Sequence, residues 1–243
     1  MDLKRRRIRV LVDTWSEIFR QGLADRESVI KLLEAMYKEA GVEPIRGAST
    51  PPDLYDKEMI SLYIIGKWGL GIDKDLDKEF VEKVFSKELL LERIIELVEK
   101  LDSFDEVCRE IGEDICKSID SGFVARLLRF AFTLMYFGFK DEEWFKNFMK
   151  KFYRIAPQFE DTIRRFARFY IAFRIGYMIE RGELKTRMDI NIAKNMAALE
   201  LSIPHCVPSN SYIAEVAKHY FVLPHRILNE LTSKRREAES NTF

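Results

Sequence analysis

Residues 123–137 read FVARLLRFAFTLMYF, and the expected fold class follows from this segment. Apolar side chains occupy nearly every position, and Arg126 and Arg129 are its only charged residues. A helix that is apolar around its whole circumference is stable only when other helices surround it. We therefore predict that residues 123–137 form the central helix of a larger helical core.

Helical periodicity continues on both sides of this segment, and no run of alternating β-branched residues bounded by turn signals predicts a strand. Proline, glycine and capping residues delimit the helices. The predicted helices cover residues 3–20, 25–40, 54–68, 75–87, 89–101, 104–119, 144–153, 159–181 and 189–201, with two more flanking Pro224. The expected fold is all-α, a multi-helix globular bundle.

Breaker residues divide the chain into regions. The segment 41–53 contains Pro44, Gly47, Pro51 and Pro52, and it predicts a boundary at about residue 50. An N-terminal helical pair, residues 1–50, is expected before it, and a helical core, residues 51–232, after it. We expect two lobes in this core, residues 51–122 and 123–232, followed by a polar tail, residues 233–243, that frays.

The two expected lobes differ in charge, although the whole chain is neutral with 40 basic and 40 acidic side chains. Asp53 to Asp114 holds 18 acidic and 9 basic side chains, whereas Phe123 to Arg187 holds 14 basic and 7 acidic ones. Neutrality excludes a general attraction to nucleic acid or membranes. The local excess either steers an anionic partner to the basic lobe or docks the two lobes together.

Composition and the start of the chain predict a soluble, cytoplasmic protein from a thermophile. Glu, Lys and Arg are frequent, whereas glutamine occurs only at Gln21 and Gln158, a bias typical of ion-pair networks that hold at high temperature. The charged start, residues 1–9, has no apolar signal region. The longest apolar run, residues 130–139, is far shorter than the roughly 20 residues of a membrane-spanning helix.

Three cysteines, Cys108, Cys116 and Cys206, form an odd set without the spacing of a disulfide framework. Cys108 and Cys116 lie on one predicted helix, about 12 Å apart along its axis. A disulfide cannot span that distance. We therefore predict small core residues, no disulfide and a reducing cytoplasm.

The predicted helix 159–181 has two contrasting faces at about 100° per residue. One arc is an aromatic stripe of Phe166, Phe169, Tyr170, Phe173 and Tyr177. The opposite half carries Arg164, Arg165, Arg168, Arg174 and Arg181. Guanidinium groups bind phosphate bidentately, so this arginine row predicts contact with the backbone of DNA or RNA. A solvated face, or one paired with the acidic lobe, is the alternative.

Two further features offer charge to a ligand. Arg126 and Arg129 in the apolar helix need partners, because a buried unpaired charge costs several kcal/mol. An acidic residue of the first half or a ligand phosphate or carboxylate meets this need. Asn210 and Ser211 follow Ser209 at the start of a predicted helix, where backbone N–H groups hold an anion or are simply capped.

Metal, cofactor and hydrolase chemistry find little support. The cluster with ligand chemistry is His205, Cys206, His219 and His225, but it lacks a paired cysteine, and adjacent residues rarely ligate one ion. Residues 66–71, GKWGLG, follow a predicted helix rather than a strand and lack the Lys-Thr ending of a phosphate loop, so they predict a helix stop. We expect no metal and no cofactor.

Three segments resemble an archaeal family that carries no assigned function, and the likeness covers most of the chain. They are RIRVLVDTW at residues 7–15, EPIRG at 43–47 and PPDLYDKE at 51–58.

Two other segments resemble helix-hairpin-helix DNA glycosylases. In the run 208–218, a proline precedes the start of a helix, and Asn210 stands where that family has its catalytic aspartate. The helix ending YMIERG, residues 177–182, resembles the archaeal oxidised-guanine branch, whose catalytic lysine falls near Arg164. A guanidinium cannot form a Schiff base, and an asparagine cannot supply the negative charge. The resemblance implies a duplex-binding scaffold whose catalytic pair is lost or moved.

The leading expectation is a non-catalytic or cryptically catalytic helical protein that binds DNA or RNA through Arg164, Arg165, Arg168 and the start of the helix after Asn210. Two rivals stay open. One is an active base-excision glycosylase that uses another amine, Lys185 or Lys194. The other is a protein-interaction scaffold whose arginine face is covered by the acidic half.

Overall fold

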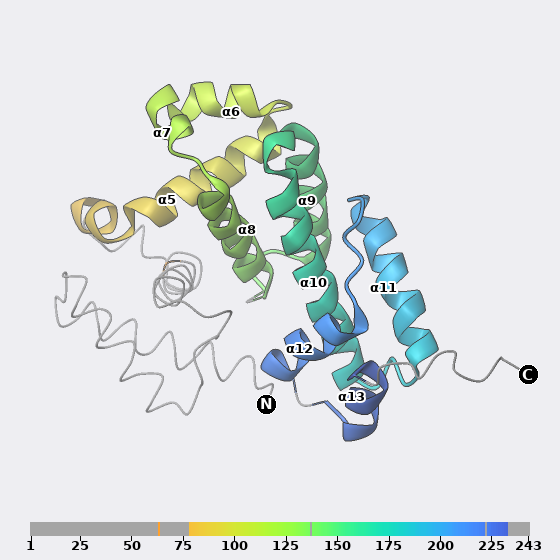
Figure 1. Ribbon diagram of the computed structural model, residues 1–243. Helices are drawn as coiled ribbons and strands as arrows, with labels where there is room; N and C mark the ends of the chain where they lie inside the picture. The colour runs from red at the N-terminus through yellow and green to blue at the C-terminus, as the bar shows by residue number, and fades with distance from the viewer. Residues whose placement is uncertain (1–62, 64–77, 137, 222, 233–243) are drawn as a thin grey trace, which may run out of the picture. The chain divides into compact units, whose positions relative to one another are not determined.

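The computed structural model describes residues 63, 78–136, 138–221 and 223–232 (Figure 1). All regular elements in these ranges are helices, so the fold class is all-α, as predicted. Chain contacts divide the protein into two compact units, Met1–Glu160 and Asp161–Phe243. The first unit therefore includes both sides of the boundary predicted at residues 122 and 123. The predicted N-terminal helical pair, the segment 41–53, the helix stop at 66–71 and the tail lie outside the described residues.

The described part of the first unit contains three long helices. They are α5 (Lys78–Lys100), α8 (Ser121–Tyr136) and α9 (Glu142–Ile155). The helix α8 contains residues 123–136 of the apolar segment that predicted the fold class, and it contacts both α5 and α9. Its side chains Leu128, Phe130 and Ala131 have no exposed surface. The burial of these side chains agrees with the central position that the sequence predicted for this helix. The sequence predicted two helices, residues 75–87 and 89–101, where the structure has the single helix α5. This prediction was wrong, because no Gly or Pro near residue 88 interrupts the helix.

The predicted helix 104–119 is broken at Gly112 into α6 (Phe104–Ile111) and α7 (Glu113–Lys117). Gly112 has a φ of +96°, a backbone region that only glycine adopts readily. The resulting turn brings the Cα atoms of Cys108 and Cys116 within 5.2 Å, and the two residues form a disulfide. The prediction of two free core cysteines was therefore wrong, because the 12 Å spacing applies only to an unbroken helix.

The second unit contains α10 (Glu160–Glu180), preceded by the short helix η2 (Pro157–Phe159), and α11 (Arg187–Leu201), α12 (Asn210–Tyr220) and α13 (His225–Thr232). The aromatic stripe of α10 meets the end of α12. Phe173 lies 5.2 Å from Tyr220 and 5.0 Å from Phe221, measured between ring centroids. Gly176 permits this close approach, because a Cβ atom there would lie 2.9 Å from the Cβ of Ala217. Tyr177, at 45% exposure, is the one stripe residue that solvent reaches freely.

The disulfide predicts a redox-dependent stability. Closing a loop of this length stabilises the folded chain by about 2–3 kcal/mol in the chain-entropy model. We expect dithiothreitol to lower the melting temperature of the wild type by about 5 °C or more. The double variant Cys108→Ser/Cys116→Ser is the matched control, and its melting temperature should not respond. Denatured, unreduced protein should show one reactive thiol, from Cys206; three reactive thiols would contradict the disulfide.

Candidate nucleic-acid interface

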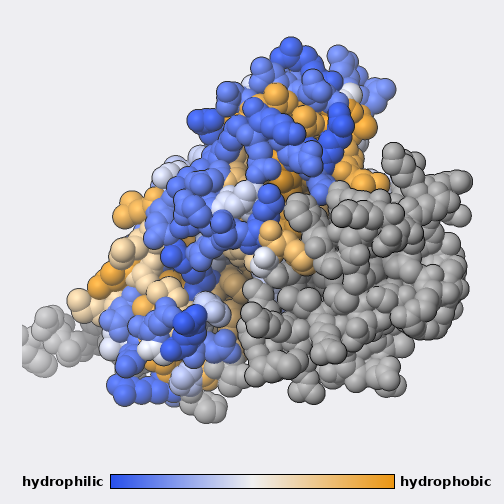
Figure 2. All heavy atoms as spheres, turned by 180° about the vertical axis from the view of Figure 1, so that it is seen from behind, coloured by the Kyte–Doolittle hydropathy of each residue, from blue (hydrophilic) through white to orange (hydrophobic). Residues whose placement is uncertain are grey.

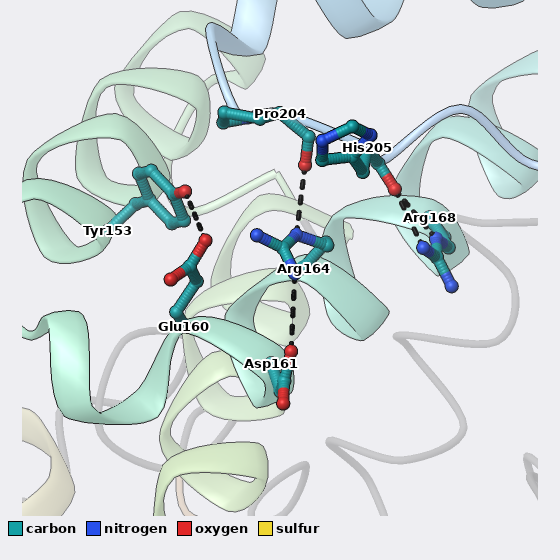
Figure 3. A network of polar contacts seen from close by, with 7 residues as sticks. All are labelled: Tyr153, Glu160, Asp161, Arg164, Arg168, Pro204 and His205. Atoms are coloured by element: carbon teal, nitrogen blue, oxygen red, sulfur yellow. Dashed lines mark hydrogen bonds and ion pairs between the residues drawn. The ribbon is translucent and has the colours of Figure 1, made fainter.

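Two arginines of the predicted row hold the loop between α11 and α12 (Figure 3). Arg164 donates from Nε to the carbonyl oxygen of Pro204 at 3.0 Å and from a terminal nitrogen to Asp161 at 3.2 Å. Arg168 donates from Nε and a terminal nitrogen to the carbonyl oxygen of His205, at 3.0 and 2.8 Å. Both guanidiniums therefore contact the loop of their own unit, and the phosphate contact expected of this arginine row stays a prediction.

The other three arginines of the row have separate environments. Arg174 forms an ion pair with Glu200 of α11 at 2.5 Å. Arg181 forms an ion pair with Glu183 at 2.9 Å and donates to the hydroxyl of Tyr177. Arg165 is exposed and makes no hydrogen bond or ion pair with the described part of the chain. The side chain of Arg165 is therefore available to a ligand.

The loop between α11 and α12 contains two residues with a left-handed backbone. Ser202 ends α11 with a φ of +53°, and His205 has a φ of +56°, so both adopt the left-handed backbone conformation. Cys206 follows with no exposed surface, and burial raises the pKa of its thiol.

No three His, Cys, Asp or Glu residues come together as metal ligands within the described ranges. His205 and His219 are exposed, whereas the side chain of His225 lies outside the description.

The start of α12 is the point where the loop, α11 and α12 meet. Ser209 caps the helix by accepting a hydrogen bond from the backbone N–H of Tyr212. Lys194 of α11 donates from Nζ to the side-chain oxygen of Asn210 at 2.8 Å. Burial lowers the pKa of Lys194, and the positive charge of Arg187 lowers it further. The side chain of Ser211 contacts the Ser209 hydroxyl at 3.0 Å.

The sequence predicted an anion site at Asn210 and Ser211. It offered Lys194 only as a candidate nucleophile. Lys194 lies seven residues after Arg187, so both occupy one face of α11. This seven-residue spacing is the feature of the sequence from which a basic face of α11 can be predicted. Its proximity to α12 depends on tertiary packing, which no local pattern encodes. Lys185, the other candidate amine, is exposed and precedes α11.

Comparison with known proteins places the chain in a family. A family model described as an uncharacterized protein conserved in archaea (DUF2192) matches residues 1–232. The chain belongs to this DUF2192 family. No curated protein and no solved structure matches it. Within the described residues of this DUF2192 protein, no helix is long and apolar enough to cross a membrane.

The buried arginines belong to the first unit of the DUF2192 protein. Arg126 forms an ion pair with Glu88 of α5 at 2.6 Å, and the Glu88 side chain is only 3% exposed. Tyr63 donates from its hydroxyl to Glu92, one turn further along α5, also at 2.6 Å. Arg126 thus has an acidic partner from the first half, one of the two answers that the sequence left open. Arg129 is half-buried, and its carbonyl oxygen accepts a hydrogen bond from Thr133.

Neighbouring arginines of α10 should differ sharply in their effect on stability. Arg168→Ala removes two hydrogen bonds from a charged group and leaves the His205 carbonyl without them, which we expect to cost about 1.5–3 kcal/mol. Arg165→Ala is the matched control, and its free energy of unfolding should stay within about 0.5 kcal/mol of the wild type. Urea unfolding measures both values. Equal stability of the two variants would contradict the role of Arg168 as the anchor of the loop.

Proposed function

We propose that the second unit binds the phosphate backbone of DNA or RNA at the start of α12, without catalysing a reaction. The observation that supports this most is the place of Lys194, whose ammonium group lies 2.8 Å from Asn210, the first residue of α12. The start of a helix carries a partial positive charge and attracts anions. A lysine at that point adds a full charge to it.

Backbone N–H groups at the start of α12 also support the proposed phosphate site. The N–H groups of Tyr212 and Ile213 donate to Ser209, through its hydroxyl and its carbonyl oxygen respectively. The N–H groups of Asn210 and Ser211 donate to no acceptor in the described part of the chain. Two backbone donors beside a lysine ammonium suit a phosphate oxygen.

The charge of the second unit is consistent with an anionic partner. Residues 161–232 contain 10 basic and 7 acidic side chains. Burial and the charge of Glu215 raise the pKa of Tyr212 in the first turn of α12, and the positive charge of Arg168 opposes this shift. Exposed Arg165 adds a further phosphate contact on α10. In this proposal Arg164 and Arg168 hold the loop in place, while Arg165 and Lys194 contact the ligand.

Salt-dependent binding tests this proposal. Affinity for a labelled duplex or an RNA strand should fall with salt at about 0.9 log unit per log unit for each phosphate contact on B-form DNA. Lys194→Gln and Arg165→Gln should each weaken binding to all sequences and reduce the slope by about one. Lys185→Gln is the matched control for a surface lysine of the same unit. Absence of binding at low salt, or equal loss in all three variants, would contradict the proposal.

A second candidate function is base excision by an amine. The likeness to helix-hairpin-helix glycosylases pairs a lysine with an acidic residue at the start of a helix. Here Lys194 contacts Asn210, the residue in that acidic position. Half-burial and a lowered pKa increase the fraction of neutral amine, which is the nucleophilic form. These observations favour Lys194 over the exposed Lys185.

Borohydride trapping separates this candidate from simple binding. An imine between Lys194 and the sugar of a damaged nucleotide would be reduced to a covalent adduct. Trapping on duplexes with an oxidised guanine or an abasic site should rise with pH, because the amine loses its proton below its usual range. Lys194→Arg should abolish the adduct, whereas Lys185→Arg should not. Without an adduct from the wild type at any pH, the excision candidate fails and binding remains.

A further inference from the structure

The helices α12 and α13 are consecutive and are joined by a short turn. Residues 221–224 connect the end of α12 at Tyr220 to the start of α13 at His225. The helix α13 packs against both α12 and α11, and Figure 1 shows it beside α12 at the lower end of the second unit. Two contacting helices with a turn of this length are the framework of the helix-turn-helix motif, whose second helix enters the major groove of DNA.

Apolar contacts fix the turn between the two helices. Phe221 leaves α12 in an extended conformation, with a φ of −138° and a ψ of 157°, and its ring centroid lies 5.0 Å from that of Phe173 in α10. Leu223 is buried in the same turn. Leu228 donates its backbone N–H to the carbonyl oxygen of Pro224, which begins α13. The start of α13 is therefore held in place by the rest of the unit, as recognition of base edges requires.

Buried and exposed residues lie on opposite sides of α13. Ile227 and Leu231 are buried. Arg226, Asn229 and Thr232 are exposed, and at about 100° per residue they lie within an arc of about 120° opposite the buried pair. In the major groove, arginine donates to guanine, asparagine pairs with adenine, and threonine contacts either kind of base pair. The outward face of α13 therefore carries side chains that can read base edges.

The polarity of this face favours nucleic acid over a protein partner. All exposed residues of α13 that the structure describes are polar. Figure 2, the view from behind, shows apolar side chains at its left edge, over α11, where Leu199 is 77% exposed. Protein interfaces are centred on large buried anchors, whereas interfaces with DNA are more polar and more basic. The helix α13 offers no apolar anchor of that kind.

The length of α12 relates the proposed phosphate site to the start of α13. The helix has 11 residues, which extend about 16 Å at 1.5 Å per residue. The major groove of B-form DNA is about 12 Å wide. A phosphate at the edge of the groove and the bases inside it therefore lie within the reach of this pair. In the helix-turn-helix motif, the first helix likewise crosses the backbone while the second enters the groove.

We propose that α13 enters the major groove of duplex DNA, where Arg226 and Asn229 contact base edges while the start of α12 holds the phosphate backbone. This inference rests on the proposed function and narrows its ligand from DNA or RNA to duplex DNA. Side chains cannot read the deep, narrow major groove of A-form RNA. Contacts to base edges also give the protein a sequence preference, which phosphate contacts alone cannot supply.

Selection from DNA duplexes with randomised central positions measures this preference. The full-length wild type should enrich a short common sequence. Arg226→Ala and Asn229→Ala should each weaken binding to the enriched duplex by about tenfold, because each loses one base contact. Neither substitution should change binding to a random duplex by as much. Asn195→Ala, at an exposed asparagine of α11, is the matched control and should leave both affinities unchanged.

The outcomes separate this inference from the proposed function. Binding without an enriched sequence, or an enriched duplex that both α13 variants bind as the wild type does, overturns the inference and leaves the phosphate site standing. Absence of duplex binding at low salt overturns both. Lys194→Gln should weaken binding to enriched and random duplexes equally, as a phosphate contact does. Asn229→Ala decides the matter by itself if Arg226→Ala does not fold.

Discussion

The hydrogen bonds from Arg168 to the carbonyl oxygen of His205 hold the loop on which the proposed site depends. The loop leaves α11 in a left-handed conformation at Ser202 and must arrive at Ser209 in an extended one to cap α12. A planar guanidinium donates two bonds in a fixed geometry, which a lysine cannot do. Arg164 repeats the contact one residue earlier, at Pro204. The start of α12 is positioned for Lys194 because this loop is fixed.

The sequence predicted elements more reliably than it predicted partners. The apolar side chains at nearly every position of residues 123–137 indicated a buried helix, and α8 is buried. The arginine row of residues 159–181 indicated phosphate contacts, but two of its guanidiniums bind backbone carbonyls. Periodicity identifies which face of a helix is polar, whereas it contains no information about a loop some 40 residues later in the chain. Contacts such as Lys194 with Asn210 depend on that packing.

The disulfide shows how a single residue alters such reasoning. Gly112 with positive φ turns one predicted helix into two and brings Cys108 to Cys116. Structural disulfides are rare in the cytosol of most organisms but occur in intracellular proteins of hyperthermophilic archaea.

The most direct test of the central claim is the response of backbone amide resonances to a short oligonucleotide. Titration of the isotope-labelled full chain, followed by ¹H–¹⁵N correlation spectra, reports on each N–H group separately. The account predicts that the amides of Asn210 and Ser211 shift first and furthest, and that Lys194→Gln reduces these shifts. Saturating oligonucleotide that leaves both amides unchanged, or that shifts resonances only elsewhere, would contradict an anion site at the start of α12.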